Sequence, residues 1–446
     1  MSESSREDES QKPVHLLVLP FPASGHIIPL LDLTRRLLTH HRRYLTVTFL
    51  VTPPCLSLLQ PLLDTFPPCA LQPLVLSPPS RPLPSSGGLI SNIRALHALS
   101  DSIVSWFRSH PSPPDALLSD FFLGWTHSLC ANLDLPRVVF YPSGAFACSV
   151  MNSLWRDAPH NPEGDDNPDF EVRFDDVPGS PRFKWSELSW LFRSGKVGDP
   201  DWEVFREEIL SNLTSWGAVF NSFSEFESVY IEHFKKEMGH DRVWAVGPLL
   251  PPVEDVDLVA QRGGPSSVPA NEVLTWLDSK TDCSVVYVCF GSRASLTAEE
   301  SAVLGVALER SRVHFIWCVR ESNGVDGATP DSAYEDRVAG RGFIIRGWAP
   351  QLAILRHRAV AAFLTHCGWN SVLESVSSGV MMLPWPTGAD QYINAQLVVG
   401  QLGLGLQVKR HGPDGVPDPN ELAQFEPRST RERLCHEAAR GSCHRG

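Results

Sequence analysis

The chain has 446 residues, of which 42% are hydrophobic and 20% charged, which is typical of a globular protein long enough for two domains. Asp and Glu outnumber Lys and Arg by 51 to 38, a formal net charge of -13, which argues against a nucleic-acid partner. We also see no secretory signal, no apolar run long enough to span a membrane and no CxxC pair among the ten cysteines, so we expect a cytoplasmic protein with reduced thiols.

Apolar runs alternate with helix-period segments along the first half of the chain. The first strand is predicted at His15–Leu19; a Pro/Gly-rich loop and a helix from His26 follow, and a second strand is expected at Leu45–Val51. Further strands are predicted at Ala116–Ser119, Val138–Tyr141 and Val243–Gly247. Strand, helix and strand joined by short turns form the βαβ unit of a parallel sheet.

Two segments interrupt this alternation. Residues 156–200 are rich in Pro, Asp, Trp and Arg and have little periodicity, so we expect a long loop with short helices. Residues 248–269 have the Pro, Gly, Ser and acidic composition of a linker. The second half then repeats the rhythm, with strands predicted at Ser284–Phe290, Val313–Val319, Phe343–Arg346, Ala361–Thr365 and Val380–Leu383.

The two halves therefore predict an α/β protein with two doubly wound, Rossmann-like domains. We place an N-terminal domain at residues 13–248, a linker at 249–270, a C-terminal domain at 271–422 and a tail at 423–446. Ligands of open parallel sheets bind beyond the carboxyl ends of the strands. Polar residues that follow a strand are therefore the first candidates for function.

Two such residues in the first half are suited to acid–base chemistry. His26 follows Gly25 at the start of a helix, where a neutral imidazole can take a proton near physiological pH. Asp120 ends a strand and can hold and polarise a histidine. The alternatives are a histidine that only caps or packs and an aspartate that serves a turn, and for either residue alone they are the more common roles.

The second half contains a candidate anion site where a strand leads into a helix. Gly368 lets the backbone approach a ligand closely, and free amides at a helix start favour an anion such as a pyrophosphate. Ser371 with Glu374 three residues later is also the pattern of an ordinary capping box. A cap does not account for His366 and Trp369 beside it, so both interpretations stay open.

Other common chemistries lack their motifs. The sequence has no GxSxG nucleophile elbow, no His/Cys spacing of a zinc site, and neither GxGxxG nor a Walker loop. Hydrolase, zinc, nicotinamide and ATP chemistry are therefore disfavoured.

Residues 348–391 carry a long ordered motif that resembles the 44-residue donor-binding signature of plant family 1 UDP-glycosyltransferases. Its matching segments are Trp348-Ala349-Pro350-Gln351, His357, His366-Cys367-Gly368-Trp369-Asn370-Ser371, Glu374, Trp385-Pro386 and Ala389-Asp390-Gln391. The similarity runs from Val14 to about Leu422, and it is strongest to the branch that acts on flavonols and small phenolic acids. It implies a GT-B fold, in which two Rossmann-like domains face a cleft.

The resemblance also implies a role for each matching residue. In the donor site, Trp348 stacks on uracil, Ala349 contacts uracil through the backbone, and Gln351 lies beside the nucleoside. Glu374 accepts hydrogen bonds from the ribose hydroxyls. The diphosphate is held near Gly368 by Ser292, His366, Asn370 and Ser371, and the sugar is held by Trp369, Asp390 and Gln391. His26 is the catalytic base, and Asp120 orients it. For Trp348 the alternative is a core tryptophan, because the chain has 13 of them.

The function that follows is the inverting transfer of a sugar from a UDP-sugar to a hydroxyl of a small phenolic acceptor such as a flavonol or hydroxybenzoate. Glucose is expected because Gln391 closes the signature, and the resemblance to the family links that residue with glucose over galactose. The UDP-sugar is a co-substrate, and we expect no cofactor and no metal ion. We expect a monomer without a nucleic-acid partner and without a membrane span.

The last residues depart from the family pattern. Residues 423–446 contain five arginines and few apolar positions, where the family continues with helices, so the end resembles a truncated one. A catalytically impaired UDP-sugar-binding protein is therefore a second hypothesis. A nicotinamide dehydrogenase is a third, disfavoured by the missing glycine loop.

Overall fold

The computed structural model describes residues 13–78, 89–195, 198–292, 296–311, 313–320, 330–408 and 419–420, so the tail at 423–446 lies outside the described residues. The chain forms two compact units that interleave along the sequence. The first unit comprises Met1–Pro142, Lys196–Phe220 and Phe234–Trp244, and the second comprises Ser143–Gly195, Asn221–His233 and Ala245–Gly446. The domain and linker boundaries expected from the sequence stay a prediction.

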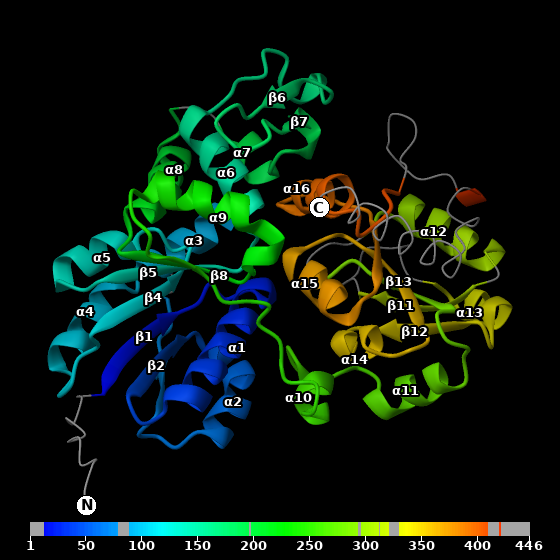
Figure 1. Cartoon of the computed structure of the whole chain (residues 1–446), viewed down its shortest axis with the longest axis horizontal. Coiled ribbons are helices and arrows are strands. Elements are labelled where there is room, and N and C mark those ends of the chain that lie inside the picture. Colours follow the sequence, from blue (N-terminus) through cyan, green and yellow to red (C-terminus); the bar gives the residue numbers. More distant parts are fainter. Residues whose placement is uncertain are drawn as a thin grey trace, which may run out of the picture. The chain divides into compact units, whose positions relative to one another are not determined.

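The sheet of the first unit has seven strands in the order β3-β2-β1-β4-β5-β8-β9. Figure 1 labels β1, β2, β4, β5 and β8 of this sheet. The strands are β1 (Val14–Leu19), β2 (Leu45–Val51), β3 (Leu71–Val75), β4 (Ala116–Asp120), β5 (Arg137–Tyr141), β8 (Gly217–Phe220) and β9 (Val243–Ala245). Strand β1 pairs in parallel with β2 on one side and with β4 on the other. The chain thus changes direction across the sheet between β1 and β4, which is the switch point where such sheets bind ligands.

The sheet of the second unit has five strands in the order β12-β11-β10-β13-β14, all paired in parallel. They are β10 (Val285–Cys289), β11 (His314–Val319), β12 (Gly342–Arg346), β13 (Val360–Thr365) and β14 (Met381–Pro384). Its switch point lies between β10 and β13. The two parallel sheets with flanking helices confirm the predicted fold class.

The helices follow the apolar periodicity of the sequence. Those of the first unit are α1 (Ser24–His41), α2 (Leu56–Thr65), α3 (Leu89–His97), α4 (Ser100–Ser109), α5 (Thr126–Leu133) and α8 (Pro200–Leu210), and α9 (Ser224–Met238) is shared by both units. The second unit contains α6 (Ala145–Asp157), α7 (Trp190–Arg193), α10 (Val256–Gln261), α11 (Ala270–Asp278), α12 (Ala298–Arg310), α13 (Ser332–Val338), α14 (Gln351–Leu355), α15 (Trp369–Ser378), α16 (Gln391–Ala395) and a π-helical turn (Gln396–Gln401). The segment expected as a long loop includes α7 and the antiparallel hairpin of β6 (Glu171–Arg173) and β7 (Arg182–Lys184).

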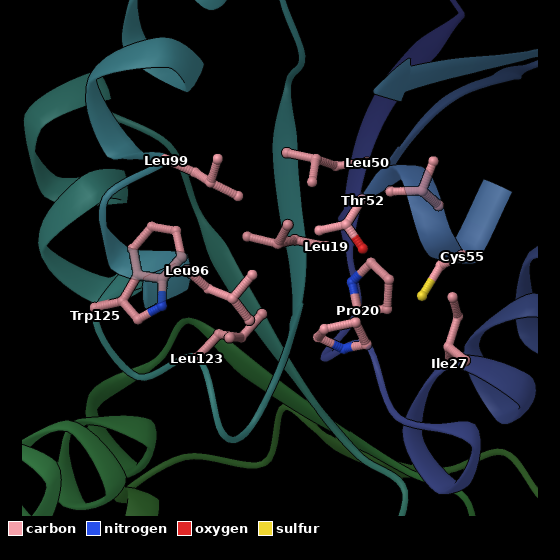
Figure 2. Close-up of a pocket in the computed structure, with 12 residues that line it drawn as sticks. Leu19, Pro20, Ile27, Leu50, Thr52, Cys55, Leu96, Leu99, Leu123 and Trp125 are labelled. Atoms are coloured by element: carbon pink, nitrogen blue, oxygen red, sulfur yellow. The ribbon is translucent and has the colours of Figure 1, made fainter. Parts of the chain in front are cut away.

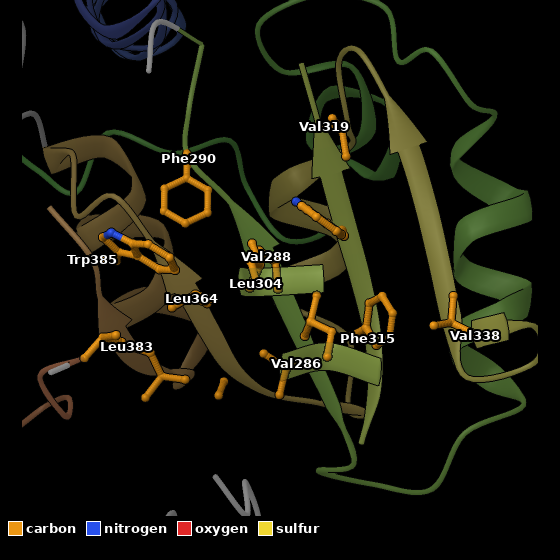
Figure 3. Packing of buried hydrophobic residues seen from close by; sticks show 14 of the residues in the cluster. Val286, Val288, Phe290, Leu304, Phe315, Val319, Val338, Leu364, Leu383 and Trp385 are labelled. Atoms are coloured by element: carbon orange, nitrogen blue, oxygen red, sulfur yellow. The ribbon is translucent and has the colours of Figure 1, made fainter. Parts of the chain in front are cut away.

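Alternating side chains of the second sheet build a core on each of its faces. Val286 and Val288 of β10 pack with Leu304 of α12 and Val338 of α13 on one face (Figure 3). Tyr287, one residue out of phase, joins the opposite core, which also contains residues of α11 and α14. A parallel strand covered by helices on both faces is apolar throughout, which is why β10 reads as a continuous apolar run. Among the described helices, none is long and apolar enough to cross a membrane.

Candidate active site

His26 and Asp120 meet at the switch point of the first sheet. Asp120 is the last residue of β4, and His26 lies in the first turn of α1, which follows β1. The Nδ1 atom of His26 is 2.9 Å from Oδ2 of Asp120. Because a carboxylate only accepts, Nδ1 carries the proton and Nε2 is left with its lone pair. This is the arrangement expected of a general base held by an acid.

The surroundings of this pair fix its orientation. Asp120 is fully buried, and its other oxygen accepts from the backbone N–H of Phe122 at 2.9 Å. The imidazole stacks on Phe121 with ring centroids 5.7 Å apart, and the ring centroid of Phe21 lies 5.2 Å away in an edge-on contact. The side chain of His26 remains 16% exposed, whereas that of Asp120 is fully buried.

A buried arginine that the sequence analysis did not identify lies close to Asp120. Arg137 at the start of β5 is 2% exposed and donates to four side-chain oxygens, at 2.7 to 3.0 Å. These partners are Ser119, Thr126, Asn212 and Ser215. Burial lowers the pKa of its guanidinium to about 10, and Asp120 is among the groups that oppose this shift. The guanidinium is thus a fixed positive charge close to the acid of the pair.

A narrow apolar cavity lies at the same edge of the first unit. Figure 2 shows Trp125 and Leu96 on one side of it and Pro20, Ile27 and Cys55 on the other. The Nε1 atom of Trp125 is buried and lacks a hydrogen-bond partner among the described residues. The cavity is therefore lined almost entirely by apolar side chains.

The switch point of the second sheet is occupied by His366 and two glycines. His366 follows β13, and Gly291 follows β10 and precedes Ser292. A Cβ added at Gly291 or at Gly368 would lie 2.5 Å from Nε2 of His366. Burial lowers the pKa of His366 to about 4. The ring is therefore neutral at physiological pH, and it can offer one N–H donor to an anion without carrying a charge.

The amino end of α15 follows at once, and its geometry excludes the capping-box alternative. The N-cap of α15 is Gly368, so Ser371 is the third residue of the helix. Its hydroxyl contacts Nε2 of Gln351 at 3.2 Å. Gln351 also donates to Oε2 of Glu374, and its own oxygen accepts from Tyr287 at 3.3 Å. The N-cap Gly368 offers no side chain to the amino end of α15, which is the kind of helix start that favours an anion.

Trp348 lies beside this network, held by a segment that the sequence analysis assigned to a linker. Its backbone N–H donates to Ser267 at 2.8 Å, and its carbonyl accepts from the N–H of Ser267 at 2.8 Å. The indole Nε1 donates to the carbonyl of Arg262 at 3.3 Å. Trp348 is half-buried, unlike the fully packed core tryptophan Trp385, and it is followed by Ala349, which is 7% exposed.

The three residues expected to hold the sugar already have protein partners. Trp369 is 3% exposed, and its Nε1 donates to the carbonyl of Asn221 at 2.6 Å, which leaves its backbone amide for a ligand. Asp390 accepts from Ser143 at 2.5 Å. The oxygen of Gln391 accepts from two backbone N–H groups at 2.8 and 3.1 Å, so only its NH₂ group remains to contact a sugar.

The structure thus brings His26 and Asp120 together in the first unit and gathers the expected donor-site residues beyond β10, β12, β13 and β14 in the second. Asn370 lies in the first turn of α15. Arg137, Arg262 and Ser267 were missed, because none of them lies at the carboxyl end of a strand or in the signature. Within the described ranges, no three His, Cys, Asp or Glu side chains are grouped so that they could hold a metal ion.

Comparison with known proteins identifies similar sequences and folds. The model of a family described as "UDP-glucoronosyl and UDP-glucosyl transferase" matches residues 241–410. A flavonol 3-O-glucosyltransferase of Arabidopsis thaliana is 49% identical over 94% of this chain and 88% of its own length. A flavonol 7-O-rhamnosyltransferase of the same plant is 37% identical over 95% of this chain and 91% of its own.

Solved structures agree over nearly the whole chain. The crystal structure of Arabidopsis thaliana UGT89C1 complexed with UDP-L-rhamnose has a TM-score of 0.74 and 36% identity, and the match covers 96% of this chain and 95% of that one. A crystal structure of UGT89C1 complexed with quercetin has a TM-score of 0.71 and 34% identity, with 95% and 90% covered.

Proposed function

This chain belongs to the UDP-glucuronosyl and UDP-glucosyl transferase family and has the GT-B fold, and on that premise we propose that it transfers glucose from UDP-glucose to a hydroxyl of a small phenolic acceptor. The sequence identity to the relatives, which extends over most of the chain, shows that the protein is a UDP-glycosyltransferase. The observation that carries the proposed chemistry is the His26–Asp120 pair, whose Nε2 is the available proton acceptor.

The proposed reaction is a single displacement at the anomeric carbon. Nε2 of His26 takes the proton of the acceptor hydroxyl while its oxygen attacks, and UDP leaves from the opposite face. An α-linked donor then gives a β-glycoside. Asp120 stabilises the imidazolium that forms, as an acid does beside a catalytic histidine. The buried guanidinium of Arg137 lies close enough to Asp120 for that group to oppose the lowering of the arginine pKa.

The donor is proposed to bind in the second unit through the residues gathered at its switch point. The diphosphate is placed at Ser292, His366 and the amides that begin α15, where fixed dipoles meet the charge that develops on the leaving group. The uracil is placed on Trp348 and the ribose at Glu374. These donors are proposed to stabilise the leaving group without a metal ion, so adding a chelator should leave the rate unchanged.

Glucose is proposed as the sugar because of Gln391 and of the relatives. The side-chain NH₂ group of Gln391 can donate to a sugar hydroxyl, whereas its side-chain oxygen accepts from the backbone N–H groups of residues 387 and 388. The relative at 49% identity is named a glucosyltransferase, whereas the one at 37% is named a rhamnosyltransferase. A donor competition in which UDP-galactose or UDP-rhamnose reacts faster than UDP-glucose would overturn this choice.

The apolar cavity of the first unit is proposed as part of the acceptor site. Its walls include Leu96 and Ile27, apolar side chains of the kind that pack against a flat aromatic ring. The cavity shares Ile27 with the helix that carries His26. The names of the relatives, which include a scopoletin glucosyltransferase of Nicotiana tabacum, support flavonols and other phenolics as acceptors.

The test is to incubate the protein with UDP-glucose and either quercetin or 4-hydroxybenzoate and to follow products by mass spectrometry. We expect a glucoside and an equal amount of UDP. UDP binding without any glucoside over a wider panel of phenols would favour the impaired-binder hypothesis, which the comparisons do not support. The proposal also includes a cytoplasmic monomer without a nucleic-acid partner, for which sedimentation and cell fractionation are the checks.

A further inference from the structure

Arg262 forms a buried ion pair with the residue expected to bind the ribose. It follows α10, outside the family signature, and its guanidinium contacts Oε1 of Glu374. The two side chains are only 9% and 5% exposed. A carboxylate buried to this degree needs a partner of opposite charge, because an unpaired ion in the protein interior is strongly unfavourable.

The same residue also holds the neighbouring part of the site. Its backbone carbonyl accepts from Nε1 of Trp348 at 3.3 Å, while its side chain contacts Glu374. Ser266 and Ser267 continue the segment and bond to the backbone of Trp348 at 3.1 and 2.8 Å. Arg262 therefore connects the expected uracil platform with the expected ribose acceptor.

The two donors on Glu374 fix the direction of its carboxylate. Arg262 contacts Oε1 and Gln351 donates to Oε2, so each oxygen is held from a different side. A carboxylate that is oriented in this way presents hydrogen-bond acceptors that suit the two adjacent hydroxyls of a ribose.

We propose that Arg262 is a positioning residue of the nucleotide site, which keeps Glu374 charged and oriented for the ribose hydroxyls. This inference rests on the proposed donor site. A second cation, Arg356, is close enough for Glu374 to act on its pKa, which burial lowers, but its guanidinium donates to the carbonyl of Pro251 at 3.2 Å. Arg262 is therefore the cation that forms the direct ion pair with this carboxylate.

The first experiment measures UDP affinity by calorimetry and the steady-state constants with UDP-glucose and quercetin. Arg262→Ala should weaken UDP binding and raise the KM for UDP-glucose by about tenfold or more, because a buried charge loses its partner. Its kcat should stay within about threefold, since Arg262 does not contact the reacting atoms. Arg262→Lys should recover most of the affinity, because it restores the charge.

Arg337→Ala is the matched control, because it removes an arginine of the same unit from an ion pair that is half exposed. Arg337→Ala should leave the UDP affinity, the KM for UDP-glucose and kcat unchanged. If Arg262→Ala does not fold, Arg262→Gln serves instead, since it keeps a donor and removes only the charge. Unchanged or tighter UDP binding in a folded Arg262 variant would overturn the inference and would make Arg262 a passive or blocking residue.

A double-mutant cycle separates this inference from the proposed function. If Arg262 acts through Glu374, then Glu374→Gln should weaken UDP binding much less in the Arg262→Ala background than in the unsubstituted protein. Additive effects would contradict the inference alone. Failure of the unsubstituted protein to bind UDP, or a Glu374→Gln variant with full affinity, would instead contradict the proposed donor site.

Discussion

The imidazole of His366 lies against two glycines, which makes these positions intolerant of any side chain. Gly291 has φ of +77°, a left-handed conformation, and an added Cβ would meet the imidazole at 2.5 Å. A Cβ added at Gly368, which follows β13, would also lie 2.5 Å from Nε2 of His366, although the backbone of Gly368 is extended. The ring is therefore fixed by packing rather than by a strong hydrogen bond, since its nearest hydroxyl, that of Thr365, is 3.4 Å away.

This packing predicts a specific effect of Gly291→Ala. The substitution should displace His366 and weaken UDP binding by about tenfold or more, in addition to a backbone strain of about 1–2 kcal/mol. Gly340→Ala is the matched control, because Gly340 has a nearly equal φ of +78° and nothing within 4 Å of the added Cβ. Calorimetric UDP titration of both variants is the check. Equal affinities in the two variants would show that the position of the imidazole does not matter.

Individual residues were predictable where chemistry and position coincide. Asp120 and His366 come directly after apolar runs, and His26 follows one through a short Pro/Gly-rich loop. The sheet order brings each of them to a switch point. Arg137 and Arg262 could not be found in this way. Arg137 lies at the start of a strand, and the partner of Arg262 is 112 positions away in the sequence. Their roles depend on contacts that only the folded chain creates.

At the scale of elements, the same short pattern serves two different purposes. Thr297 and Glu300 form a complete capping box at α12, with hydrogen bonds of 3.1 and 2.9 Å. Ser371 and Glu374 have the same spacing, but α15 begins two residues before Ser371. The sequence could not separate these cases, because the start of α15 is set by Gly368 and the turn before it.

Paired substitutions should therefore have opposite outcomes. Thr297→Ala should lower the free energy of unfolding by about 1 kcal/mol and leave the KM for UDP-glucose unchanged. Ser371→Ala should change stability by less than about 0.5 kcal/mol and weaken UDP binding. Urea unfolding and UDP titration of each variant provide the measurements. A loss of stability in Ser371→Ala as large as in Thr297→Ala would restore the capping interpretation.

Two strands of the first sheet did not appear in the sequence analysis, for physical reasons. Strand β3 contains Pro73 and is mostly exposed, as an edge strand can be, so it lacks an apolar run. Strand β8 has only four residues and begins with a glycine. The other strands of the two sheets lie within two residues of their predicted bounds, because burial on both faces forces an apolar run.

At the scale of the whole molecule, a buried carboxyl group gives the fold a pH-dependent stability. Glu208 of α8 is largely buried, and burial raises its pKa from 4.5 to about 7, with Arg94 opposing the shift. His97 lies 3.7 Å from it. The raised pKa means that the folded state holds this proton more tightly than the unfolded state. Its contribution is therefore fully present below pH 4.5 and is lost as the pH rises through 7.

Glu208→Gln should remove this dependence. At pH 8 the variant should be more stable than the unsubstituted protein by about 1–2 kcal/mol, which is less than the full pKa shift would give because solvent partly screens the group. At pH 4.5, the ordinary pKa of the group, the two proteins should have nearly the same stability. Urea unfolding at both pH values is the measurement. A difference in stability that stays constant between the two pH values would show that Glu208 does not titrate in this range.

The central claim is that His26 is the base in the transfer of a sugar from a UDP-sugar to an acceptor hydroxyl. The most direct test compares glucoside formation and UDP affinity in the unsubstituted protein, in His26→Ala and in His40→Ala, which removes an exposed histidine from the same helix. We predict that His26→Ala lowers kcat by about a hundredfold or more while the Kd for UDP is unchanged, and that His40→Ala affects neither. Turnover by His26→Ala at the rate of the unsubstituted protein would contradict the account.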